Sequence, residues 1–77
     1  MNVLKKNIIG QKVREARLKH KPSLTQDQLS AKLAALGVTI DRVGISKIES
    51  GARRVYDFEL KALARVLRVS STSLLGG

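Results

Sequence analysis

The chain has 77 residues, of which 43% are hydrophobic, with no cysteine and one histidine. This length admits one small domain with a modest hydrophobic core. It is near the lower limit at which a chain folds without disulfide bonds or bound metal ions. The missing cysteines exclude a disulfide scaffold and a thiolate zinc site, and few side chains remain for acid–base chemistry. We therefore expect a single domain over residues 1–77 that is not an enzyme and holds no metal or other cofactor.

The charge is strongly unbalanced. Fifteen Lys and Arg against six Asp and Glu give a net charge of +9. The cationic side chains repel one another and destabilise the folded state unless an anionic partner neutralises them. DNA, RNA and anionic lipid fit this charge equally well. The longest apolar stretches, such as Leu33 to Val38, are far shorter than the ~20 residues that a membrane-spanning helix needs. We expect a soluble protein inside the cell.

Apolar residues at helical spacing predict two helices in the first half of the chain. The first covers about Ile8 to Lys19. Its inward stripe contains Ile9, Val13, Ala16, Arg17 and His20. The second begins after Pro22, where Thr25 followed three residues later by Gln28 forms a capping box. Its buried face is expected to consist of Leu29, Leu33 and Leu36.

A third helix is predicted from Arg42 to about Ser50, with Asp41 as its N-cap and Gly51 at its end. Ile45 and Ile48 are three residues apart and face inward. The outer side then carries Arg42, Val43, Ser46 and Lys47. This outer side is cationic and contains no acidic residue.

A fourth helix begins at Asp57 or a neighbouring cap, and Ser70 caps a short fifth turn that carries Leu74 and Leu75. The inward face of the fourth helix is Leu60, Leu63, Ala64 and Leu67. No segment shows the sustained alternation of a strand. The predicted fold class is therefore all-α, with five short helices around one core.

Three segments, in their order and spacing, resemble the signature of the Cro/CI (lambda-repressor-like, XRE) helix-turn-helix family. They are Leu24 to Leu29, Ile45 to Gly51 and Leu60 to Leu67, the last followed by Val69-Ser70. The resemblance extends from Ile9 to Leu75. It implies a compact five-helix domain that binds duplex DNA, with a helix-turn-helix at helices two and three and the third helix in the major groove.

The sequence departs from the family pattern in two connections. Residues Ala34 to Ile40 make a longer link between the second and third helices than is usual, and Lys21 to Ser23 lengthen the first loop. Arg68 stands where a helix-ending glycine is common. The resemblance thus leaves the angle of the third helix open, although no DNA-contacting position is lost.

The resemblance implies that the outer face of the third helix contacts DNA bases through Arg42, Val43, Ser46 and Lys47. An arginine in the first turn can donate two hydrogen bonds to guanine O6 and N7, and the alternative for Arg42 is a solvated or phosphate-bound side chain. Val43 contacts a thymine methyl or is a spare apolar residue. Lys47 either reads guanine or holds a phosphate.

Four further residues are expected to contact the DNA backbone: Gln26, Ser50, Arg53 and Arg54. The family uses the Gln26 position on a phosphate, and simple capping of the second helix is the alternative. The other three follow the third helix in a loop that flanks the DNA. Residues 1–7 form either a loose tail or a flexible arm that reaches DNA through Lys5 and Lys6.

Two pairs of residues are assigned to structure and assembly. Arg17 and Glu49 interrupt apolar stripes, and the resemblance sets them opposite each other as a structural ion pair. Leu74 and Leu75 are expected at a dimer interface, with burial in the monomer core as the alternative. The aromatic residues Tyr56 and Phe58 are interpreted as core or dimer-surface residues.

The sequence thus predicts a sequence-specific, double-stranded-DNA-binding transcriptional regulator. We expect a repressor that binds a palindromic operator as a homodimer in the cytoplasm, associated with the nucleoid. The alternative is an antitoxin-like module of the same fold that binds a toxin and regulates its own synthesis. Binding to RNA or to a membrane surface is disfavoured, because aromatic residues are few and no basic amphipathic helix is evident.

Overall fold

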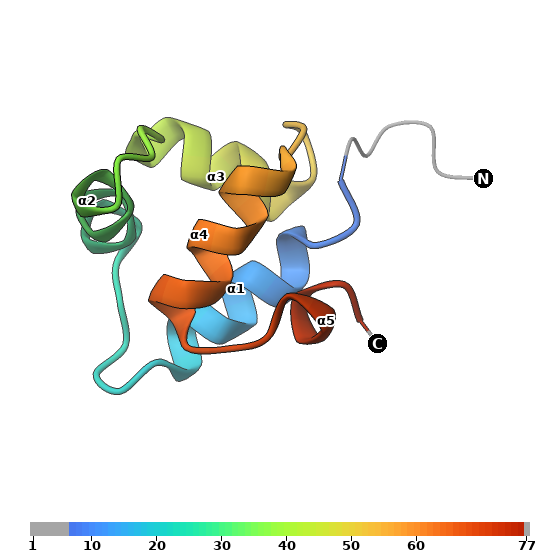
Figure 1. Ribbon diagram of the computed structural model, residues 1–77, viewed down its shortest axis with the longest axis horizontal. Helices are drawn as coiled ribbons and strands as arrows, with labels where there is room; N and C mark the ends of the chain where they lie inside the picture. Colours follow the sequence, from blue (N-terminus) through green and yellow to red (C-terminus); the bar gives the residue numbers. More distant parts are fainter. Residues whose placement is uncertain (1–6, 77) are drawn as a thin grey trace.

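The computed structural model describes residues 7–76, and within that range every regular element is helical (Figure 1). The helices are α1 (Gly10–Lys19), α2 (Gln26–Ala35), α3 (Arg42–Ser50), α4 (Asp57–Leu67) and α5 (Ser71–Leu74). The all-α, five-helix prediction is confirmed, with the first helix starting at Gly10 instead of Ile8. No helix in this range is long and apolar enough to cross a membrane.

The helix ends follow the capping signals of the sequence. Thr25 and Gln28 form the capping box of α2, with the Gln28 N–H donating to Thr25 Oγ1 at 3.0 Å and the Thr25 N–H donating to Gln28 Oε1 at 2.8 Å. The Asp41 side chain caps α3, Ser70 caps α5, and Gly51 ends α3 in the left-handed conformation at φ 82°. Local hydrogen bonding therefore fixes these boundaries.

Helix α4 begins and ends in less usual ways. Its N-cap is Tyr56, the neighbour of Asp57, and the Tyr56 N–H donates to Glu59 Oε1 at 3.1 Å. Its last turn ends at Arg68, which has φ 60° and is the one non-glycine residue with positive φ among residues 7–76. The helix therefore ends in the left-handed conformation even though the glycine usual in the family is absent.

One core unites all five helices. Its fully buried side chains include Val13, Leu29, Leu33, Ile45, Ile48, Leu63 and Leu74. Leu36 was expected on the buried face of the second helix, and this was wrong: its side chain is 40% exposed. Helix α2 ends at Ala35, so that Leu36 leaves the helical stripe, and Val38 and Ile40 enter the core instead.

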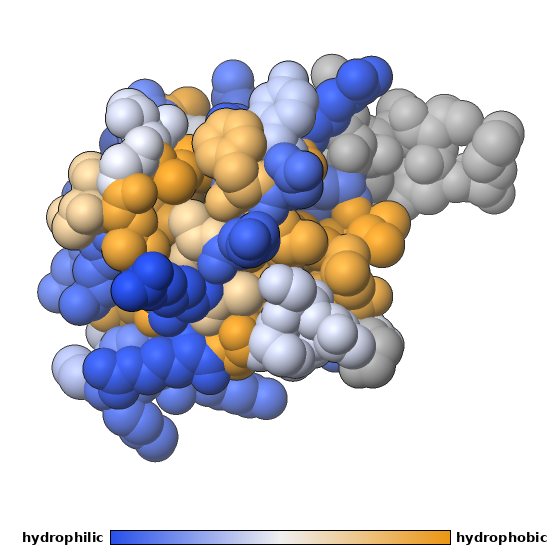
Figure 2. All heavy atoms as spheres, in the orientation of Figure 1, coloured by the Kyte–Doolittle hydropathy of each residue, from blue (hydrophilic) through white to orange (hydrophobic). Residues whose placement is uncertain are grey.

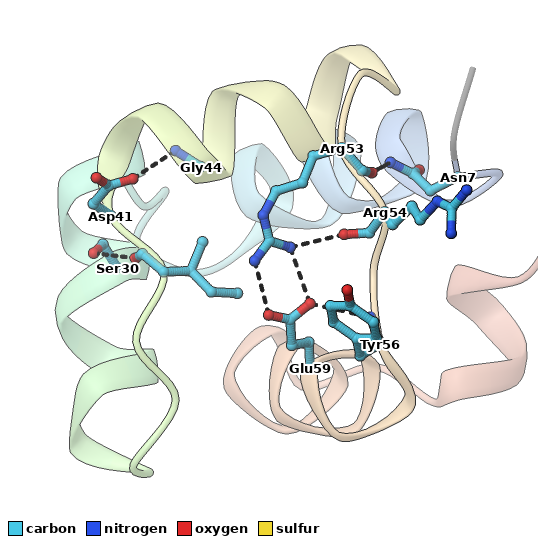
Figure 3. Close-up of polar contacts among 9 residues, drawn as sticks. Asn7, Ser30, Asp41, Gly44, Arg53, Arg54, Tyr56 and Glu59 are labelled. Atoms are coloured by element: carbon cyan, nitrogen blue, oxygen red, sulfur yellow. Dashed lines mark hydrogen bonds and ion pairs between the residues drawn. The ribbon is translucent and has the colours of Figure 1, made fainter. Parts of the chain in front are cut away.

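The long connection between α2 and α3 is held in place by the core. Gly37 takes φ 81°, and the Val38 N–H then donates to Leu33 O at 3.0 Å. Val38 and Ile40 are both buried, and the Ser30 hydroxyl donates to Ile40 O (Figure 3). Two buried anchors and two hydrogen bonds thus determine the angle of α3 that the sequence left open.

Candidate nucleic-acid interface

The outer face of α3 is exposed along its whole length. Arg42 keeps 61% of its side chain exposed and Val43 is 51% exposed, while Ser46 and Lys47 are also exposed one turn later. The inward residues Ile45 and Ile48 are fully buried. The structure therefore brings the four predicted base-contacting residues together on one solvent-facing surface.

The start of α2 lies beside the start of α3. Arg42 Nε is 3.8 Å from Asp27 Oδ1, and both side chains are largely exposed, so this ion pair is weak and easily exchanged. The Gln26 amide is turned inward, where Nε2 donates to Glu49 Oε1 at 3.2 Å. Gln26 thus connects the first turn of α2 to the last turn of α3.

A buried ion pair supports the other side of α3. Arg17 Nε lies 2.7 Å from Glu49 Oε2, and Arg17 Nη2 donates to Glu49 Oε1 at 3.0 Å. The exposed fractions of the two side chains are 10% and 5%. Arg17 Nη1 also donates to Leu24 O at 2.8 Å. This ion pair fixes α3 against α1 and against the residues that lead into α2.

The N-terminal end of α1 meets the C-terminal end of α3. Asn7 Nδ2 donates to Ile48 O at 3.1 Å and to Arg53 O at 2.7 Å, and Asn7 Oδ1 accepts from the Ile9 N–H. The expectation that Asn7 belongs to a loose tail was therefore wrong. Lys5 and Lys6 lie outside the described residues.

The two adjacent arginines in the loop after α3 have different surroundings. Arg53 Nη1 and Nη2 donate to the two Glu59 carboxylate oxygens at 2.9 Å each, and Nη1 also donates to Arg54 O (Figure 3). Arg54 is exposed, and its side chain points away from Glu59 (Figure 3). Nearby, the Ser50 hydroxyl donates to Lys47 O within the last turn of α3. Arg53 therefore has a structural role that the sequence did not indicate.

The Arg53–Glu59 pair also changes the titration of both groups. The hydrogen bonds from Arg53 lower the pKa of the Glu59 carboxyl below its usual range, and burial opposes this shift. The same hydrogen bonds raise the pKa of the Arg53 guanidinium. Both groups stay charged near neutral pH, so the loop remains attached to the first turn of α4.

The remaining predicted residues lie near the C-terminus and at the start of α4. Leu74 is 1% exposed and belongs to the core, whereas Leu75 is 49% exposed. Tyr56 and Phe58 are 59% and 58% exposed, and their rings stack with centroids 6.2 Å apart. Core burial of these two aromatic residues, one of the two interpretations, was wrong.

A shallow hollow lies between α3 and the loop that follows it. It is lined by Val43, Gly44, Lys47, Ala52, Arg53 and Arg54. Three of these residues are cations, and such a basic, concave strip suits the phosphate oxygens of a nucleic acid. Among residues 7–76 no group of three His, Asp or Glu side chains could hold a metal ion.

Two helices joined by a connection, the second presented outward with a cationic face, form a helix-turn-helix, the arrangement of a class of DNA-binding proteins. The family model described as Helix-turn-helix matches residues 13–74, which is most of the chain. The chain belongs to this family, the XRE-type helix-turn-helix proteins, and is a DNA-binding regulator. Comparison with curated proteins and with solved structures found no match.

Proposed function

We propose that the protein is a sequence-specific transcriptional repressor that inserts α3 into the major groove of duplex DNA. The observation that carries this proposal is the exposed outer face of α3, with Arg42 and Lys47 on either side of Val43 and Ser46. It acts by occupying its operator and performs no chemistry on the DNA. Its place of action is the cytoplasm, at the nucleoid.

Arg42 is the main base-reading residue. It lies in the first turn of α3, and its only ion-pair partner among residues 7–76 is the exposed Asp27 at 3.8 Å, which a guanine can replace at little cost. Val43 contacts a thymine methyl, and Ser46 and Lys47 extend the contact by one turn. These four residues set the preferred sequence.

The DNA backbone is held on both sides of α3. Arg54 binds a phosphate directly, since its side chain is exposed and belongs to no ion pair among residues 7–76. Ser50 and Gln26 add hydrogen bonds, Gln26 after it releases Glu49. Arg53 is largely neutralised by Glu59 but keeps 28% of its side chain exposed, so it adds a weaker contact to the backbone. Phosphate contacts of this kind fix the register of the protein on the duplex.

The salt dependence of DNA binding tests these assignments. After selection of a preferred duplex from a random library, log K should fall by about 0.9 per unit of log salt for each phosphate neutralised. Arg54→Ala should reduce this slope by about 1 for each bound protomer and weaken all sequences equally, whereas Arg42→Ala should cost about 1–3 kcal/mol of preference at one base position in each half-site. Binding is measured by fluorescence anisotropy at several salt concentrations.

Arg65→Ala is the matched control, because it removes the same exposed charge from α4, away from the proposed interface. It should change both the slope and the sequence preference much less than the other two variants. A flat salt dependence contradicts DNA binding through phosphates. Uniform weakening by Arg42→Ala contradicts its role in base reading.

We further propose that the repressor binds a palindromic operator as a homodimer. One short recognition helix covers few base pairs, and a twofold pair with half-site centres about 34 Å apart doubles the sequence that is read. The exposed Leu75 supports an interface at the C-terminal end. Leu74 is committed to the core and does not contribute surface to that interface.

Footprinting on the selected duplex tests the dimer. We expect two protected segments separated by about one helical turn, which Leu75→Ser reduces to weaker, uncoupled protection. Thr72→Ala serves as the control, because Thr72 is an exposed residue of the same short helix. Protection of a single half-site at saturating protein would exclude the dimeric mode.

A further inference from the structure

A second surface of the molecule carries more positive charge than the α3 face. Three adjoining hollows run along α4. The first lies between α1, α4 and α5, and shares His20 and Arg68 with the second. The second shares Leu36 and Arg65 with the third, which ends at Phe58. We call this depression the α4 groove; none of its lining residues belongs to α3.

The rim of the α4 groove is almost purely cationic. Lys12, Lys19 and Lys21 line it from α1 and the following loop. Lys32 lines it from α2, Lys61 and Arg65 from α4, and Arg68 from just beyond the end of α4. Glu15 is the one acid among these lining residues, and none of the three ion pairs within residues 7–76 includes a rim cation. The rim therefore presents seven positive charges against one negative.

Helix dipoles explain only part of this charge. Lys19, Lys32 and Arg65 lie in the last turns of α1, α2 and α4. A cation there stabilises the helix by interacting with the negative end of its dipole. Lys12 and Lys61 lie outside the last turns, and Lys21 and Arg68 lie beyond the helix ends. The repulsion among the remaining cations lowers the stability of the free protein, so a partner that neutralises them gains affinity.

The floor of the groove is mainly apolar in the first and third hollows, whereas the middle hollow is more polar. Leu36 and Phe58 remain 40% and 58% exposed at one end, and Val66 and Val69 are partly buried along the rest. Figure 2 views this face of the molecule, where orange surface lies between blue side chains in front of and below α4. A phosphate backbone would use the cations but gain nothing from Leu36 and Phe58. A second copy of this chain has only six acidic residues in all, too few on any one face to match seven rim cations.

We propose that the α4 groove binds an acidic, amphipathic segment of a partner protein, with its apolar side chains on the floor and its carboxylates along the rim. This is the occupant whose chemistry uses both features of the groove. Because α3 contributes nothing to the lining, the partner binds while the recognition helix stays free for DNA. This inference does not depend on the proposed recognition of an operator by α3.

The probe for this site is a fluorescein-labelled synthetic peptide of about four helical turns, with glutamates on one face and leucines on the other. Two matched peptides replace either all leucines by serine or all glutamates by glutamine. We expect the first peptide to bind with Kd below about 100 μM, and each matched peptide to bind at least about tenfold more weakly. Fluorescence anisotropy measures the binding.

Three protein variants locate the site. Arg65→Glu reverses one exposed rim charge, and Leu36→Ser/Phe58→Ser keeps the charge but removes exposed apolar surface. Each should weaken binding of the first peptide by about tenfold or more. Arg54→Glu, a charge reversal outside the groove, should leave it within about twofold. Circular dichroism verifies that every variant is folded.

The same variants distinguish the other occupants. If the first peptide fails to bind the wild-type protein, or if Arg54→Glu weakens it as much as the rim variant does, the proposal is wrong and the attraction is only general charge. If a non-operator duplex loses as much affinity from the rim variant as from Arg54→Glu, the groove is a nucleic-acid surface instead. Peptide binding that depends on both rim and floor supports the proposal.

Discussion

Glu49→Ala is expected to unfold the protein or bring it close to unfolding. The substitution leaves the guanidinium of Arg17, whose side chain is only 10% exposed, without its carboxylate partner. Removal of one member of a buried pair costs about 3–5 kcal/mol, which matches the whole stability of many domains of this size. We therefore expect the melting temperature to fall by more than about 12 °C in thermal unfolding followed by circular dichroism.

Two further variants separate the unpaired charge from other effects. Glu15→Ala removes the same charge from α1, where Glu15 only accepts a 3.4 Å hydrogen bond from Gln11, and it should change stability by less than about 0.5 kcal/mol. The double variant Arg17→Met/Glu49→Leu leaves no buried charge, so it should recover part of the loss caused by Glu49→Ala. A melting temperature for Glu49→Ala within about 2 °C of wild type would contradict the buried pair.

The sequence predicted those parts of the fold that depend on neighbours in the chain. The capping box at Thr25 and the caps at Asp41 and Ser70 are satisfied within three residues, so they can be read without tertiary information. The same is true of the inward face of α3 and of three of the four residues predicted for that of α4, because helical spacing alone selects them; Leu60 is only partly buried, whereas Ala62 and Glu59, which were not predicted, are buried. The ion pair of Arg17 with Glu49 joins residues 32 apart and was assigned only through the family resemblance.

The missed features all depend on contacts between distant segments. Leu36 continued the helical spacing, but α2 ends one residue earlier and the following residues enter the core. Arg53 looked like a free surface cation because its partner Glu59 lies in the next helix. Asn7 looked like part of a tail, whereas it contacts carbonyls 41 and 46 residues away. No local pattern distinguishes such side chains from solvated ones.

Gly10 is another residue whose importance only the folded structure reveals. Its φ is not among the positive values of the described glycines, so backbone conformation does not require glycine there. The requirement is space: a Cβ atom at Gly10 would lie 2.3 Å from Ile48 O and 2.8 Å from Glu49 O. Both atoms belong to the backbone of α3. The missing side chain lets the start of α1 pack directly on the last turn of α3.

Gly10→Ala should therefore destabilise the protein by about 3 kcal/mol, the upper end of the range for overpacking, because neither carbonyl can move without displacing α3. Gln11→Ala, an exposed change in the same turn, should stay within about 0.5 kcal/mol of wild type. Gly44→Ala should cost less than Gly10→Ala, since its nearest contacts are the side chains of Ile40 at 2.8 Å and Asp41 at 3.1 Å. Urea unfolding measures all three variants. A Gly10→Ala protein as stable as wild type would contradict the close packing of the start of α1 on the backbone of α3.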